Sequence, residues 1–157
     1  MQIKYLNECD FVNYKEPSMF IGFPKCSFKC DRENGSQLCQ NWALSMETDI
    51  SLSIDNIVYR YKNNGITSAI VCGGLEPLDS WNDLKELIEC LREITKDVIV
   101  VYTGYNENEL SEEQISFFQN NSPVIVKYGR YRPNQEPHFD EILGVNLASD
   151  NQYSKMY

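Results

Sequence analysis

Three closely spaced cysteines are the residues whose type and spacing most clearly indicate chemistry. Cys26, Cys30 and Cys39 fall within fourteen residues, in the pattern Cys26-x3-Cys30-x8-Cys39. Thiolates at such short spacing can wrap a compact inorganic cluster, with one thiolate on each iron. A [4Fe–4S] cubane held by three cysteines keeps its fourth iron open to an exogenous ligand. The spacing therefore predicts a [4Fe–4S] cluster with one open iron.

Two other interpretations of these cysteines stay open. A structural zinc site would need a fourth ligand, for which His138 or Cys72 is available in the chain, although neither lies at the usual short spacing. Free cysteines also pack in hydrophobic cores, and we expect this of Cys72 and Cys90. Cys9 has no assigned role.

Two further motifs, GGLEP at residues 73–77 and YTGY at 102–105, follow apolar segments. Gly73 and Gly74 lack Cβ atoms, so a ligand can lie against bare backbone, and the strand-end carbonyls there can bind an ammonium group. Glu76 adds a further acceptor, and Tyr102 can reach the same rim. The alternatives are an ordinary turn at the glycines and a tyrosine that packs in the core.

The spacing of apolar residues indicates the strands and helices that must position these motifs. Strands are expected at residues 19–23, 68–74, 98–104 and 123–129. Ser53 is the expected N-cap of a helix that buries Ile54, Ile57, Val58 and Tyr61 and ends at Gly65. A second helix starts at Ser80, with Leu84, Leu87, Ile88 and Leu91 on its buried face, and a third starts at the Ser111–Gln114 capping box.

Alternation of strands and helices predicts an α/β domain, spanning residues 1–157, with a parallel sheet and helices packed outside it. Such sheets bind ligands beyond the carboxyl ends of their strands. The cysteine loop, GGLEP and YTGY should therefore meet at one rim. The last residues are expected to be irregular around a short strand at 141–145.

Composition excludes several classes of function. The chain has 157 residues and a net charge of −9, so direct binding to nucleic acid or to an anionic membrane surface is disfavoured. The N-terminal segment has no long apolar run of the kind found in signals or anchors. We expect a cytoplasmic protein, in which thiols stay reduced. The sequence indicates no Ser–His–Asp or Cys–His nucleophile arrangement, and it contains no Walker-type phosphate loop.

These motifs resemble those of the radical S-adenosylmethionine (SAM) superfamily. More narrowly, the chain resembles the activating protein of the anaerobic (class III) ribonucleoside-triphosphate reductase. The resemblance is carried, in the family's order, by CDFVN at 9–13, the cysteine loop, GGLEP, YTGY and SDNQ at 149–152. It implies a small partial (β/α) barrel.

The resemblance also implies cofactors, roles and partners. Cys26, Cys30 and Cys39 would hold the [4Fe–4S] cluster, Leu38 and Gln40 would flank the adenine of SAM, and Asn41 would brace the loop. Gly73, Gly74, Glu76 and Tyr102 would complete the SAM site. A flavodoxin-type reductant would supply one electron, and the resulting 5′-deoxyadenosyl radical would generate a glycyl radical on the reductase.

The chain departs from the family pattern in two places. Eight residues separate Cys30 from Cys39 where the family has two, and Leu75 is extra within GGLEP. The entropic cost of closing a loop grows only logarithmically with its length, so the longer gap costs about 1–1.5 kcal/mol. Binding of the cluster by the three cysteines should survive this cost. Asn34-Gly35 is expected to let the insert bulge out as a turn.

Three other hypotheses for the function stay open. They are a radical enzyme with another protein or small-molecule substrate, a structural metal-binding module, and a family member that binds a cluster without cleaving SAM.

Overall fold

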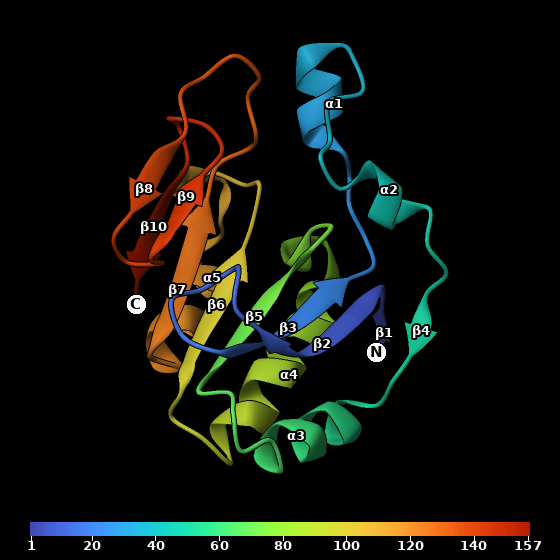
Figure 1. Cartoon of the computed structure of the whole chain (residues 1–157), viewed down its shortest axis with the longest axis vertical. Helices are drawn as coiled ribbons and strands as arrows, with labels where there is room; N and C mark the ends of the chain where they lie inside the picture. The colour runs from blue at the N-terminus through green and yellow to red at the C-terminus, as the bar shows by residue number, and fades with distance from the viewer.

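A computed structural model describes residues 1–157 as an open α/β sheet with helices on one face (Figure 1). The strands are β1 (Gln2–Ile3), β2 (Tyr5–Asp10), β3 (Ser18–Phe23), β4 (Ile50–Ser51), β5 (Ala69–Gly74), β6 (Val98–Tyr102), β7 (Val124–Tyr128), β8 (His138–Asp140), β9 (Val145–Leu147) and β10 (Tyr153–Met156). The helices are α1 (Lys29–Asn34), α2 (Trp42–Ser45), α3 (Ile54–Lys62), α4 (Trp81–Arg92) and α5 (Glu112–Asn120), with 3₁₀ turns η1 (Pro77–Ser80) and η2 (Glu107–Glu109).

The central sheet has six strands in the order β10-β7-β6-β5-β3-β2. Its four inner strands are parallel, as predicted, with Val71 of β5 beside Phe20 of β3 and Val100 of β6. The two edge strands, β2 and β10, are antiparallel and were not predicted. The sheet is therefore mixed and open rather than a closed barrel.

The two faces of the sheet are covered differently. Alternate strand residues such as Ile70, Cys72 and Val101 pack against α3, α4 and α5 in the larger core. Residues of the opposite parity, such as Val71 and Val100, pack in a smaller core with Tyr14, Leu143 and Leu147. No helix covers that second face, which leaves room for a pocket where the inner strands end.

The predicted helices form where their periodicity placed them. Ser53 caps α3 by accepting a hydrogen bond from the Asn56 N–H, and the Ser111–Gln114 capping box opens α5. α3 ends at Lys62 rather than at Gly65, because the Asn64 side chain accepts from the N–H groups of Ile66 and Thr67 and turns the chain.

Two local predictions were wrong. Ser80 does not cap α4 with its side chain, because η1 runs directly into that helix. The expected strand at 141–145 is largely the turn between β8 and β9: the Asp140 carboxylate accepts from the Leu143 N–H, and Gly144 has a φ of 73°. None of the helices has the length and apolarity needed to cross a membrane.

Candidate metal centre and pocket

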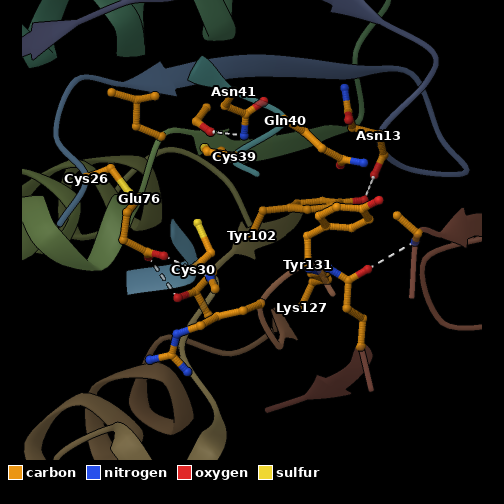
Figure 2. A pocket seen from close by; sticks show the side chains of 18 of the residues that line it. Asn13, Cys26, Cys30, Cys39, Gln40, Asn41, Glu76, Tyr102, Lys127 and Tyr131 are labelled. Atoms are coloured by element: carbon orange, nitrogen blue, oxygen red, sulfur yellow. Dashed lines mark hydrogen bonds between the residues drawn. The ribbon is translucent and has the colours of Figure 1, made fainter. Parts of the chain in front are cut away.

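A pocket of about 780 Å³ lies at the carboxyl ends of the inner strands, on the face without helices. Cys26, Cys30 and Cys39 line it together with residues of GGLEP and YTGY. Figure 2 shows the three cysteines on one side of the pocket, with Tyr102, Lys127 and Asn13 toward the other. The three motifs meet at one rim, as the topology predicted.

The thiols are half-buried and influence one another. The pKa of Cys26 is raised to about 12 and that of Cys30 to about 11, mainly by burial and in part by the nearby Cys39. The Cys26 sulfur accepts a hydrogen bond from the Phe28 N–H at 3.2 Å, which favours a thiolate. No three metal-binding side chains are close enough to share a single ion. In a cubane, by contrast, each thiolate binds a different iron.

The loop between Cys26 and Cys30 turns sharply at Phe28. This residue has a φ of 50°, in the left-handed region that bulky side chains rarely adopt. Its ring packs on Trp42 of α2 with 5.4 Å between centroids. The contact joins the chain before Cys30 to the chain after Cys39, so the residues on both sides of the insert are held together.

The first half of the insert between Cys30 and Cys39 is helical, so the insert is not a simple bulging turn. Residues 31–34 complete α1, and Gly35, with a φ of 65°, ends it. The turn predicted at Asn34-Gly35 is thus the C-terminus of a helix. In Figure 1, α1 and α2 lie beyond the carboxyl ends of the inner strands.

The GGLEP segment is tied to the cysteine loop through its backbone. The Asn41 side-chain amide donates to the Gly74 carbonyl at 2.7 Å and so links the cysteine loop to GGLEP. The Glu76 N–H donates to the Lys25 carbonyl at 2.8 Å. Gly74 has a φ of 88°, and a Cβ there would lie 2.8 Å from the Gly22 Cα, so this glycine is required by packing.

Glu76 lies at the base of the pocket with only 4% of its surface exposed. Its oxygens accept from the Leu78 N–H, the Thr103 hydroxyl and the Gly104 N–H. Burial raises the pKa of this carboxyl to about 7, against the opposing effect of these bonds. Glu76 thus joins GGLEP to YTGY, in addition to facing the pocket.

Most of the predicted site residues come together. Gln40, Asn41, Gly73, Gly74, Glu76 and Tyr102 all line the pocket with the cysteines. Leu38 does not: its backbone N–H faces Asp31, and its side chain is not part of the lining. The Tyr102 hydroxyl donates to the Asn13 carbonyl at 2.6 Å, and burial raises its pKa.

The sequence analysis missed Lys127 and Arg130, two cations at the end of β7. Lys127 lines the pocket, is 8% exposed, and donates to the Gly129 carbonyl at 3.0 Å without forming an ion pair. Burial lowers its pKa to about 8. Arg130 makes a bidentate pair with Glu109 at 2.6 and 2.7 Å. A lone lysine inside the apolar segment PVIVKYG was the available signal for Lys127.

SDNQ, the last of the motifs, fastens the C-terminal segment to the pocket. The Gln152 side chain accepts from the Ala148 N–H at 3.0 Å and donates to the Gly129 carbonyl at 3.1 Å. Asn151 donates to the Arg130 carbonyl at 2.9 Å. Gln152 thus shares the Gly129 carbonyl with Lys127 and fixes the end of β7.

A protein-family model described as a 4Fe-4S single cluster domain matches residues 18–151, which is most of the chain. The chain therefore belongs to the 4Fe-4S single cluster domain family. This is an iron–sulfur protein, and the matched region contains all three clustered cysteines. Comparison with curated proteins and with solved structures gives no match.

Proposed function

We propose that the chain is a radical SAM enzyme that activates an anaerobic ribonucleoside-triphosphate reductase. The observation that carries the proposal is the shared pocket. Three cysteines, a glycine-rich strand end and YTGY line one cavity of about 780 Å³, in the motif order of the activating proteins that the sequence resembles. The open α/β sheet has its helices on one face and the pocket on the other, an arrangement that fits a radical-SAM-like partial barrel.

The donor set fits a [4Fe–4S] cluster. Three half-buried thiols face one cavity, and a backbone N–H already points at the Cys26 sulfur. Cys26, Cys30 and Cys39 would bind three irons and leave the fourth for the amino and carboxylate groups of SAM. When bound and reduced, the cluster supplies the single electron that splits SAM into methionine and a 5′-deoxyadenosyl radical.

The residues of this chain would bind and enclose the ligand. Gly73, which packs against the Phe20 ring, borders the cavity together with the side chains of Gln40 and Tyr102. Lys127 offers a buried ammonium with two unused donors, which suits the carboxylate oxygen of the methionine moiety that would not bind iron. The 5′-deoxyadenosyl radical would then take a hydrogen atom from a glycine of the reductase, giving 5′-deoxyadenosine and a glycyl radical.

The test is an anaerobic reconstitution with iron and sulfide, followed by reduction with a flavodoxin-type reductant. Addition of SAM should shift the EPR signal of the reduced cluster and yield 5′-deoxyadenosine and methionine. When the reductase is added, SAM cleavage should be accompanied by the EPR signal of a glycyl radical on the reductase. One tightly bound zinc, with no cluster, would refute the proposal in favour of a structural module. A cluster without cleavage would favour the non-catalytic family member.

A second candidate, a radical enzyme acting on a small acidic molecule, is favoured by the same lysine. Lys127 is a buried cation without an ionic partner, and such charges are normally paired. A carboxylate or phosphate of a second substrate would pair with it as well as SAM would. SAM cleavage without any glycyl radical on the reductase would support this candidate.

A further inference from the structure

The gap of eight residues between Cys30 and Cys39 is closed by a specific contact. The Oδ1 atom of Asp31 accepts hydrogen bonds from the backbone N–H groups of Leu38 and Cys39, each with an N–O distance of 2.8 Å. The Cys30 thiol lies 3.7 Å from the same oxygen. One carboxylate oxygen therefore contacts both the second and the third cysteine of the motif.

The position of Asp31 makes this contact informative. Asp31 is adjacent to Cys30 in the sequence, so a bond from its side chain to the Cys39 N–H fixes one cysteine relative to the other. A carboxylate that accepts two N–H groups makes charge-assisted hydrogen bonds, which are stronger than neutral ones. The six residues between Asp31 and Leu38 can then vary in path without moving Cys39.

The opposite side of α1 is fastened independently. Glu33 pairs with Arg130 at 3.4 Å, and Lys29 pairs with Glu109 at 3.5 Å. Lys29 also lies over the Tyr105 ring, 4.0 Å from its centroid. These contacts set the orientation of the helix against the β6–α5 connection, while only Asp31 reaches the chain that enters Cys39.

We propose that Asp31 is a positioning residue that presents the Cys39 thiol to the cluster and so compensates for the long insert. The proposal rests on the assignment of Cys39 as an iron ligand made above. It explains how a chain with eight residues between the second and third cysteines keeps the ligand set of a chain with two. Asp31 acts through the backbone of Leu38 and Cys39, and not as an iron ligand.

The test compares Asp31→Ala and Asp31→Asn with the wild-type protein, all reconstituted anaerobically with iron and sulfide. The asparagine amide oxygen can accept the same two N–H groups, whereas alanine cannot. Glu33→Gln is the matched control, because it removes a charge from the same helix without touching the cysteine backbone. Cys39→Ala is the reference for a lost ligand. The readouts are iron per chain, the rate of iron loss to a chelator, and the EPR spectrum of the reduced protein.

We expect Asp31→Ala to lose iron to the chelator at least about tenfold faster than wild type, because charge-assisted hydrogen bonds contribute on that scale. Its EPR spectrum should approach that of Cys39→Ala. Glu33→Gln should stay within about twofold of wild type, whereas Asp31→Asn, which keeps both hydrogen bonds without the charge, should lose iron at a rate between those of wild type and Asp31→Ala. Far-UV circular dichroism and thermal melting of the apo proteins separate these effects from misfolding, since α1 lies outside both hydrophobic cores.

Two results would overturn the proposal. Wild-type iron retention in Asp31→Ala, with Cys39→Ala depleted, would show that Cys39 is a ligand that needs no positioning. Equal loss in Asp31→Asn and Asp31→Ala would show that the carboxylate acts through its charge or by binding iron. Full iron retention in Cys39→Ala would instead refute the ligand assignment on which the proposed function depends.

Discussion

The Asp79 carboxylate accepts a hydrogen bond from the backbone N–H of Ser27, with an N–O distance of 2.5 Å. Its second oxygen accepts from the Tyr105 hydroxyl at 2.6 Å. These partners lie 52 residues before and 26 residues after Asp79. One side chain of η1 therefore joins the residue after Cys26 to YTGY.

Replacement of Asp79 by alanine should destabilise the protein by about 2 kcal/mol, because two hydrogen bonds to a partly buried carboxylate are lost. Chemical denaturation of the apo protein measures this. Glu86→Ala, at an exposed position of α4, is the control and should change stability by less than about 0.5 kcal/mol. Equal stability of the Asp79→Ala variant and wild type would show that the contact contributes nothing to folding.

The parts of this site that the sequence predicted are those with local signals. Apolar segments at 19–23, 68–74, 98–104 and 123–129 became the inner strands because each is buried on both faces. The convergence of the cysteines, Gly73 and Tyr102 followed from the rule that parallel strands end at the same rim.

The parts that were missed depend on long-range pairing. β2 and β10 are edge strands with exposed polar residues, so their composition does not distinguish them from loops. Asp31 and Asp79 act through hydrogen bonds to backbone groups distant in sequence, and no local pattern indicates such partners. Leu38 was expected to flank the adenine because the resemblance puts that ligand beside Cys39, but Leu38 is not among the residues that line the pocket.

Substitution of Cys39 by alanine should remove the intact [4Fe–4S] centre, because one iron loses its protein ligand. Iron analysis and EPR after anaerobic reconstitution measure the loss. Cys90→Ser is a suitable control, since Cys90 lies on α4 and packs against the helix-side core. Were Cys39→Ala to keep a full cluster, the replacement ligand would not be Cys72, which is fully buried on the helix face of β5.

Replacement of Gly74 by alanine should destabilise the fold by at least about 1–2 kcal/mol, the cost of a left-handed conformation for a residue with a Cβ. The new Cβ would also lie 2.9 Å from the Phe23 backbone nitrogen, just before the cysteine loop. Gly65→Ala is the matched control, because nothing lies within 4 Å of a Cβ there. Denaturant midpoints of the two variants should differ, and a Gly74→Ala protein as stable as Gly65→Ala would contradict the packing described.

The last prediction concerns Lys127 and the pH dependence of SAM binding. Burial lowers the pKa of Lys127 to about 8, so the ammonium is present below that pH and is lost as the pH rises through it. If this ammonium binds the SAM carboxylate, affinity in the reconstituted protein should fall about tenfold between pH 7 and pH 9. Calorimetric titration at several pH values measures it.

The ligand itself titrates in the same range, because an α-amino group has a pKa of about 8. Variants at position 127 separate the two effects, since each sees the same ligand. Lys127→Arg keeps its charge and should lose less affinity than wild type at pH 9, whereas Lys127→Met should bind weakly even at pH 7. If SAM affinity has the same pH dependence in wild type, Lys127→Arg and Lys127→Met, and is equal in all three at pH 7, then Lys127 does not bind SAM. Lys127 would then serve the fold through its bond to the Gly129 carbonyl, or it would bind the small acidic substrate of the second candidate function.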